Sequence, residues 1–518
     1  MRTTKLYPTF VALSLLTACN VDSSSAESET GGGGSTTDDE EAGSSVAESE
    51  SASTTAVTDG DDTTVGATEA GDSTGTAVVA QFRLVHAAAG TANIDVYLAG
   101  SGEPILTDLA YGSASDYVEV PVGSLEFEVR LAGSSVDEAP AYTSGGTEIT
   151  VDATMTAIAS GSLGANDVAE GFVILPLIDG FTEPGADQVA VRVVNVAGDL
   201  ESFDVNVDND GGTPEVVGVA NLGDSGPAGV ALSAGTALQL GLERDATVVT
   251  AFTMPELPAG AGVFAIVTGQ LHAPPRAATG LAMLLVGPDG VIESVAQNPF
   301  VYAFHAIPDG GPLDLCVGGA QVATGTTFGM LARLAVPPGV HDIAFHIAPS
   351  DFTSEPESTQ STSPVVAGEQ YLAIAAGEAV PEEGEGAFTM LTQAEAFTLD
   401  AAPDAVLAFI HVASAPALDF GTLDGDQITD DTVLVTDLAF GQTSALIRVP
   451  ASDLQLGILL AGVALPAAPV GLIATPLAQG MRTWIVAVGD LSPNGGDVPA
   501  GVYSIDTGSN PWVAVELL

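Results

Sequence analysis

The sequence predicts an all-β protein, built of tandem immunoglobulin-like (Ig-like) β-sandwich repeats after a disordered acidic tether. At residue 79 the composition changes from Ser, Thr, Gly and acidic residues to alternating apolar and polar residues. Short segments of period-two alternation then recur between Gly, Pro, Asn and Asp, as in sandwiches and barrels. A set of sequence marks also recurs in one order about every 108 residues, which is close to the ~100 residues of one Ig-like sandwich.

The N-terminal residues have the features of a secretory signal. Arg2 and Lys5 precede an apolar run of about eleven residues, which is too short to span a bilayer. The run ends in residues 16–19, LTAC, which resemble the bacterial lipobox. The resemblance implies a signal peptide over residues 1–18 and a lipid on the sulfur and new amino group of Cys19. An ordinary signal peptide with a chance cysteine is the alternative.

Residues 19–78 are the predicted tether. Residues 20–78 contain 11 Ser, 11 Thr, 9 Gly and 14 acidic residues, with no aromatic or basic residue. Such a segment cannot bury enough apolar area to offset its chain entropy. Asn20 is not the aspartate that retains lipoproteins at the inner membrane of enteric bacteria, which favours the outer membrane. We therefore expect the folded part to be held away from the outer membrane, exposed at the cell surface.

Four repeats follow, over residues 79–186, 187–298, 299–400 and 401–518. Each repeat begins with an apolar segment that ends in His or Asn, and an aspartate between apolar residues follows eight or nine positions later. These pairs are His86 and Asp95, Asn195 and Asp204, His305 and Asp314, and His411 and Asp419. A turn of the type L-x-Y-G comes next in all four repeats, and a Val-Pro turn follows in three of them.

This order of marks resembles a bacterial family known only as a domain of unknown function, number 4397 in that series. Its members carry a V-H-A start with a V-D-V segment, an L-x-Y-G turn and a V-P-A-G turn. The first repeat matches best, the third and fourth match well, and the second matches loosely, with Asn195 in place of the histidine. The resemblance covers most of residues 80–518. It implies an extracytoplasmic all-β module of surface lipoproteins, with no established enzyme activity.

The charge balance excludes several functions. The chain has 67 acidic and 10 basic residues, a formal net charge of −57, and Lys5 is its only lysine. A nucleic-acid binder needs Lys and Arg to neutralise phosphates, so we expect no nucleic-acid partner. A Walker-type phosphate loop and Schiff-base chemistry each need a lysine, and the mature chain has none.

The repeated histidines are candidates for a structural role. Asn195 occupies the position of the histidine in one repeat, which indicates hydrogen bonding rather than proton transfer. A buried imidazole needs polar partners, and the aspartate of the next strand can supply one. We therefore predict four His–Asp or Asn–Asp braces formed by the pairs named above. Ligand contact and metal binding by the histidines are the alternatives.

The acidic excess suggests either a solvated surface or Ca²⁺ sites. Net charge far from zero opposes aggregation, which favours the first interpretation. Calcium needs six to eight oxygen ligands from flexible loops. Asp208 and Asp210 in one run, and Asp424 with Asp426 in another, come nearest to that pattern, but neither run completes an EF-hand. Calcium binding by these carboxylates is therefore the alternative to a solvated surface, and we expect no other cofactor.

Two further residues could carry chemistry. Residues 223–227, GDSGP, resemble the nucleophile motif of trypsin-like proteases with one glycine missing, so a hydrolase that uses Ser225 is a remote alternative. These residue types are also those that a turn requires. Cys316 lies in an apolar run, and we expect a small buried residue there. With Cys19 lipidated, we expect no disulfide within the chain.

Together these observations predict a non-enzymatic lipoprotein of the cell envelope, structural or adhesive in role. We expect its partners to be the membrane, through Cys19, and envelope proteins or glycans. A Ca²⁺-stabilised module that binds a ligand or glycan is the alternative function.

Overall fold

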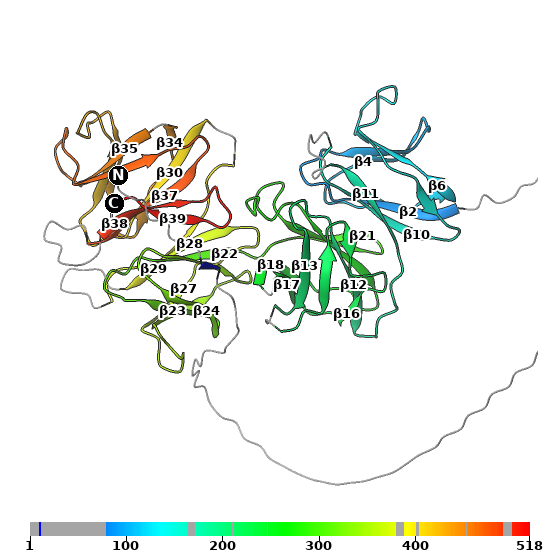
Figure 1. The fold of residues 1–518 in the computed structure, drawn as a ribbon, viewed down its shortest axis with the longest axis horizontal. Coiled ribbons are helices and arrows are strands. Elements are labelled where there is room, and N and C mark those ends of the chain that lie inside the picture. Colours follow the sequence, from blue (N-terminus) through cyan, green and yellow to red (C-terminus); the bar gives the residue numbers. More distant parts are fainter. Residues whose placement is uncertain are drawn as a thin grey trace, which may run out of the picture. The chain divides into compact units, whose positions relative to one another are not determined.

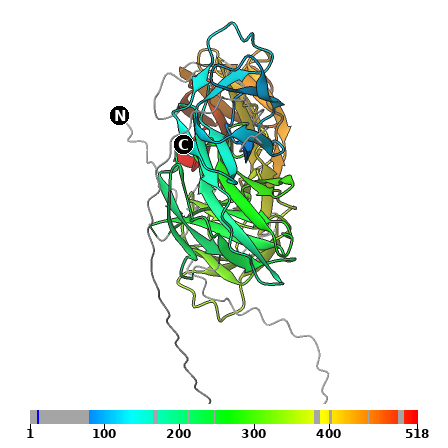
Figure 2. The same ribbon diagram turned by 90° about the vertical axis from the view of Figure 1, so that its right-hand side faces the viewer.

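The computed structural model describes residues 10–11, 79–163, 171–209, 212–245, 247–379, 388–399, 403–451, 453–490 and 500–518. Cys19 and the predicted tether lie outside these ranges. Every regular element within them is a strand (Figures 1 and 2), which confirms the all-β prediction. Among the same residues no helix is long and apolar enough to cross a membrane.

The strands of the described residues from Val79 onward form four successive sandwiches of two main sheets, named sandwiches 1–4 here. Sandwich 1 contains β2 (Val79–His86), β3 (Ile94–Leu98), β4 (Pro104–Leu109), β5 (Val118–Pro121), β6 (Gly123–Leu125), β7 (Phe127–Leu131), β8 (Tyr142–Thr143), β9 (Thr147–Ile149), β10 (Thr154–Ser160) and β11 (Val173–Ile178). Sandwich 2 contains β12 (Gln188–Asn195), β13 (Ser202–Val207), β14 (Val216–Ala220), β15 (Gly223–Asp224), β16 (Val230–Ser233), β17 (Leu238–Arg244), β18 (Thr247–Met254), β19 (Gly262–Thr268), β20 (Ala282–Gly287) and β21 (Gly290–Ala296).

Sandwich 3 contains β22 (Phe300–His305), β23 (Leu313–Val317), β24 (Ala320–Thr326), β25 (Leu331–Ala335), β26 (Asp342–Ile347), β27 (Ser358–Ser361), β28 (Gln370–Ala376) and β29 (Thr389–Ala394). Sandwich 4 contains β30 (Asp404–His411), β31 (Leu418–Thr422), β32 (Val433–Leu438), β33 (Gln442–Thr443), β34 (Ile447–Pro450), β35 (Asp453–Leu460), β36 (Gly471–Pro476), β37 (Arg482–Gly489), β38 (Ala500–Asp506) and β39 (Val513–Glu516). One further strand, β1 (Phe10–Val11), lies within the predicted signal peptide and pairs in parallel with β25.

The sandwiches share one strand order. In sandwich 1 one main sheet runs β11-β10-β2-β5 and the other β4-β3-β7-β8, and β6 and β9 form a further two-stranded sheet. The first strand pairs in parallel with a late strand in every sandwich: β2 with β10, β12 with β19, β22 with β28, and β30 with β37. An Ig constant domain places its first, second, fourth and fifth strands in one sheet. The two-sheet architecture is therefore the expected one, but its connectivity is different.

Each sandwich has an apolar core between its two sheets. In sandwich 1, Phe82 and Leu84 of the first sheet pack with Val96, Phe127 and Val129 of the second. Equivalent cores fill the other three sandwiches. These alternating inward side chains are what the period-two pattern predicts.

The sandwiches also pack in pairs through their parallel sheets. Val85 and Ile158 of sandwich 1 share a second core with Val194, Phe264 and Ile266 of sandwich 2. A corresponding core joins sandwiches 3 and 4. There Trp512 stacks on Tyr302 with ring centroids 4.1 Å apart. The first strands are therefore buried on both faces, as parallel strands usually are.

Cys316 of β23 is 1% exposed and packs with Ala344 and Phe352, as expected of a small core residue. It also takes part in a disulfide in the structure, contrary to our expectation. The chain has one other cysteine, Cys19, which lies outside the described residues.

Candidate functional site

The repeated histidine lies at the end of the first strand, and both of its ring nitrogens bind backbone groups. In sandwich 1 the N–H of Ala88 donates to Nδ1 of His86 at 3.3 Å. The nitrogen Nε2 lies 3.2 Å from the carbonyl oxygen of Ala92 and must therefore donate to it. This arrangement fixes the neutral tautomer that carries its proton on Nε2.

The other sandwiches repeat this geometry. Nε2 of His305 donates to the carbonyl of Gly311 at 2.7 Å, and Nε2 of His411 donates to the carbonyl of Pro416 at 3.0 Å. In sandwich 2, the side-chain oxygen of Asn195 accepts from the N–H of Ala197 at 3.2 Å, and its amide nitrogen donates to Leu200 at 2.9 Å. An asparagine thus makes the same two bonds as a neutral histidine.

The electrostatics agree with a neutral imidazole. Burial lowers the pKa of His86, His305 and His411, while the hydrogen bond to a backbone carbonyl opposes the shift. All three side chains are almost inaccessible to solvent, at 2% exposure or less. Their geometry suits a role in holding the loop after the first strand.

The repeated aspartate holds a different part of the backbone. Oδ1 of Asp95 accepts from the N–H of Asp108 at 2.7 Å, and Oδ2 accepts from Gly133 at 3.1 Å. Asp108 has a φ of 53° and lies beside a bulge between β3 and β4. The carboxylate therefore stabilises a left-handed residue, a conformation that costs energy in most residues.

The same contact recurs in each sandwich. Asp204 accepts from Gly218, Asp314 from Gly325, and Asp419 from Asp437, at 2.6–2.7 Å. Each of these donors also has a positive φ. The His–Asp and Asn–Asp braces that we expected are thus two separate devices in every sandwich. The histidine or asparagine holds one loop and the aspartate holds a bulge.

Ser225 also has a structural position. Its hydroxyl accepts from the N–H of Val193 at 3.0 Å. Ser115 and Ser444 make the equivalent bond to Leu84 and Phe409 in sandwiches 1 and 4. The neighbouring Asp224 pairs with Arg192 at 2.9 Å. The GDSGP segment is therefore a turn that fastens the first strand of its sandwich.

Three of the four carboxylates suggested for calcium, those of Asp208, Asp424 and Asp426, are described and lie in exposed turns. Asp424 and Gln427 exchange backbone hydrogen bonds around a tight turn that also contains Asp426. Asp208 follows β13 with a φ of 66°, and Asp210 lies outside the described residues. Among the residues that the structure does describe, no group of three or more His, Cys, Asp or Glu side chains is placed to hold a metal ion.

Sequence reasoning missed the role of the arginines. Arg83 of sandwich 1 is 2% exposed and donates to the carbonyl of Gly287 in sandwich 2 at 2.6 Å. Arg192 occupies the equivalent position in sandwich 2 and donates back to Ile178 of sandwich 1 at 2.8 Å. Not every arginine has this role, since Arg244 and Arg448 are exposed. The signal in the sequence is that Arg83 and Arg192 recur at the same place in the apolar first strands.

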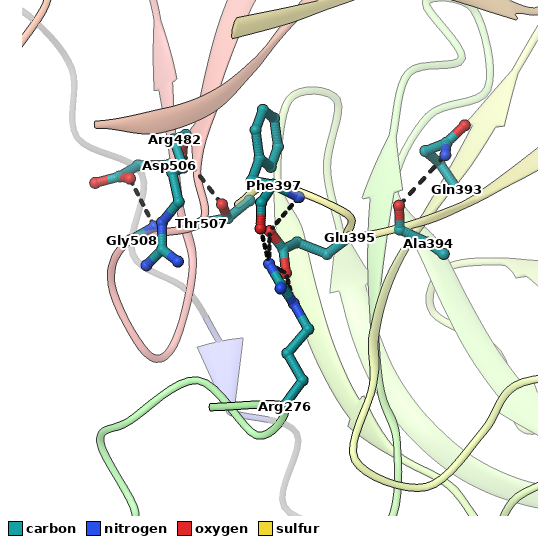
Figure 3. A network of polar contacts seen from close by, with 9 residues as sticks. All are labelled: Arg276, Gln393, Ala394, Glu395, Phe397, Arg482, Asp506, Thr507 and Gly508. Atoms are coloured by element: carbon teal, nitrogen blue, oxygen red, sulfur yellow. Dashed lines mark hydrogen bonds and ion pairs between the residues drawn. The ribbon is translucent and has the colours of Figure 1, made fainter. Parts of the chain in front are cut away.

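A third arginine forms the centre of a polar network between sandwiches 2 and 3 (Figure 3). Nε of Arg276 donates to Oε2 of Glu395 at 2.7 Å, and Nη2 donates to Oε1 at 2.9 Å. The same guanidinium donates to the carbonyl of Phe397, whose N–H donates to Glu395 at 3.0 Å. Burial raises the pKa of Glu395, and Arg276 opposes that shift. Bidentate geometry of this kind fixes orientation as well as charge.

One cavity of about 120 Å³ lies between sandwiches 1 and 2. It is lined by residues at the carboxyl ends of the parallel strands, including Ser160, Thr268 and Gln270, and by the loop at Asn221 and Leu222. Leu222 has a φ of 55° and is 42% exposed. Glycines take the same position in the other sandwiches. For example, the N–H of Gly112 donates to the carbonyl of His86, and the N–H of Leu222 donates to the carbonyl of Asn195.

Comparison with known proteins gives a family match in two regions. Residues 80–206 and 299–421 match the family described as "Domain of unknown function (DUF4397)". Each match begins at the first strand of sandwich 1 or 3 and reaches into the next sandwich. No curated protein matches the chain. Among solved structures, the Bacillus anthracis TIE protein is similar at 10% identity and a TM-score of 0.13, over 79% of this chain and 69% of that one.

Proposed function

We propose that the chain is a non-enzymatic lipoprotein, anchored through Cys19 in the outer membrane and displayed at the cell surface as a structural or adhesive binding protein. One observation carries this proposal more than any other. The histidine that recurs in three sandwiches and the aspartate that recurs in all four bind backbone groups, as His86 and Asp95 do, and so does Ser225. The recurring polar side chains therefore stabilise the backbone of each sandwich.

The family match supports a β-rich module, and the lipobox-like residues 16–19 support export and anchoring. The distribution of charge supports display in solvent. Arg83 and Arg192 are buried between sandwiches, so they do little to offset the carboxylates at the surface. A surface of one sign stays solvated and disfavours contact with anionic partners. The partners are therefore neutral or cationic groups of the envelope.

The test of display is protease treatment of intact cells. We expect added protease to release fragments of the sandwiches while a periplasmic control protein stays intact. The matched variant is Cys19→Ala, which removes the lipid and should lose attachment to the membrane fraction without unfolding the sandwiches. Full protection of the chain on intact cells would contradict surface display.

The redox state of Cys316, which is in a disulfide in the structure, gives a test of the proposed lipid on Cys19. A sulfur that carries a lipid cannot also form a disulfide, and the chain has only two cysteines. Lipidation at Cys19 therefore requires that the sulfur of Cys316 be reduced in the mature monomer. Alkylation of the denatured protein without reductant should label Cys316 if the proposal is right.

A further inference from the structure

We propose that the cavity between sandwiches 1 and 2 is a binding site for a small neutral polyol, such as the terminal hexose of a glycan. This inference rests on the proposed adhesive function and names a ligand class for it. The cavity combines a symmetric frame, uncharged polar groups and small apolar walls.

The cavity lies where the two sandwiches meet with matched residues. Ser160 donates to the carbonyl of Val196 at 2.9 Å, and Thr268 donates to the carbonyl of Ala87 at 2.5 Å. Ser160 and Thr268 are the last residues of β10 and β19 and take equivalent places, as the pairing registers show. Because each sandwich holds the other in the same way, the frame of the cavity is fixed from both sides.

The lining residues that the structure describes carry no charge. None of these fifteen residues is ionisable, although the chain has 67 acidic residues. Within this described lining a cation would find no carboxylate, and an anion would find no arginine. The site therefore suits a neutral molecule.

The lining also offers unused hydrogen-bonding groups. The side chains of Ser162 and Gln270 make no hydrogen bond with any residue that the structure describes, and they occupy equivalent positions in the two sandwiches. Asn221 uses its amide nitrogen on the carbonyl of Ala197 and keeps its oxygen for another donor. Hydroxyl and amide groups of this kind both donate and accept, as ring hydroxyls require.

Size and wall chemistry fit the same class. A volume of about 120 Å³ corresponds to about four waters at ~30 Å³ each, and drug-sized ligands need about 300 Å³ or more. Ala89, Val173 and Leu222 give apolar contact for the C–H groups of a sugar ring. A whole hexose is larger than four waters, so the cavity takes one edge of a terminal sugar ring, and it is too small for a peptide segment.

The second pair of sandwiches provides an internal comparison. Ala376 and Val488 stand where Ser160 and Thr268 stand in the first pair, and Glu378 stands in the place of Ser162. The uncharged hydroxyl and amide groups are thus specific to the pair of sandwiches 1 and 2.

A filling variant tests the site. Gly198 lines the cavity without a positive φ, and a Cβ placed there would meet only Gln270 at 3.9 Å. Gly198→Leu should therefore fill the cavity without backbone strain. Gly102→Leu is the matched control, because a Cβ at Gly102 meets nothing within 4 Å. Ser162→Glu is a second variant that makes this position acidic, as at Glu378.

The experiment is saturation-transfer NMR on the whole chain, in a detergent without sugar groups, with D-glucose, D-galactose, D-mannose and D-glucuronate as probes. We expect saturation transfer to at least one neutral hexose and a weaker signal from glucuronate. We also expect Gly198→Leu and Ser162→Glu to lower the affinity for that hexose at least tenfold. Gly102→Leu should leave the affinity unchanged. Absence of transfer to every hexose, equal binding of glucuronate, or unchanged binding in both cavity variants would overturn the inference. Protease accessibility on intact cells tests surface display separately, so the two failures are distinguishable.

Discussion

Ser160 and Thr268 hold sandwiches 1 and 2 together by the same bond made in opposite directions. Each hydroxyl crosses the interface and donates to a carbonyl at the end of the other sandwich's first strand. Both side chains are buried, at 3% and 1% exposure. The pair of sandwiches, rather than the single sandwich, is therefore the structural unit of this chain.

Removing either hydroxyl should loosen the pair. Ser160→Ala leaves the carbonyl of Val196 without its hydroxyl donor, which costs about 1–3 kcal/mol. Thr268→Val should cost less, because the carbonyl of Ala87 also accepts from the N–H of Ala89. Hydrogen exchange followed by mass spectrometry should show faster exchange in β10 and β19, with no change in β37. Equal exchange in the variants and the native chain would show that the interface does not depend on these bonds.

The histidines should make stability depend on pH. Burial holds the pKa of His86, His305 and His411 below the usual 6.5, so the unfolded chain binds more protons than the folded chain just below pH 6.5. Their contribution is complete above pH 6.5 and is lost as the pH falls towards their folded pKa.

The matched variant for this prediction is His→Asn at all three positions, because Asn195 already makes both backbone bonds. Its loss of stability between pH 7.5 and 5.5 should be smaller than that of the native chain, measured by urea denaturation. The carboxylates are unchanged and cancel in the difference. Identical pH profiles would mean that the histidines do not stay neutral in the folded state.

Leu222 should be replaceable by glycine with a gain in stability. Its φ of 55° costs roughly 1–2 kcal/mol in a non-glycine residue. We therefore expect Leu222→Gly to stabilise sandwich 2 by about 1 kcal/mol, whereas Gly112→Leu, with a φ of 77° at the equivalent position, should destabilise sandwich 1. Urea denaturation gives both values. Destabilisation by Leu222→Gly would show that contacts of the leucine outweigh the strain.

Calcium should leave the thermal midpoint of the whole chain unchanged relative to magnesium. Asp424 and Asp426 lie in an exposed turn, and no described cluster of ligands surrounds Asp208. A ligand present at 100 times its Kd would add about 2.7 kcal/mol to stability. A midpoint that rises with Ca²⁺, but not with Mg²⁺ or with chelator, would restore the calcium-stabilised alternative.

The repeat pattern predicted much of the fold and less of its chemistry. The short segments of period-two alternation indicated the sandwich class. The recurring histidine and aspartate marked the loops and bulges that these side chains hold. The hydrogen-bond partners of these side chains could not be predicted from spacing along the chain. His86 binds the N–H of Ala88 and not the carboxylate of Asp95, and only the folded structure shows this.

The alternation of apolar and polar residues also could not show which sandwiches pack against each other. Arg83 and Gln81 make β2 look exposed on one face, yet Arg83 is 2% exposed because its guanidinium ends at Gly287 of the next sandwich. Val85, on that same face, packs into the shared core. A polar residue in a first strand can thus mark a contact between sandwiches as well as a solvated face.

The N-terminal peptide of the protein, purified from membranes, gives the most direct test of the proposed function. Mass spectrometry should find that the chain begins at Cys19, with a diacylglyceryl group on its sulfur and an acyl group on its amino nitrogen. A chain that begins elsewhere, or a Cys19 peptide without lipid and joined to the peptide of Cys316 by a disulfide, would contradict the proposed anchor and the surface display that depends on it.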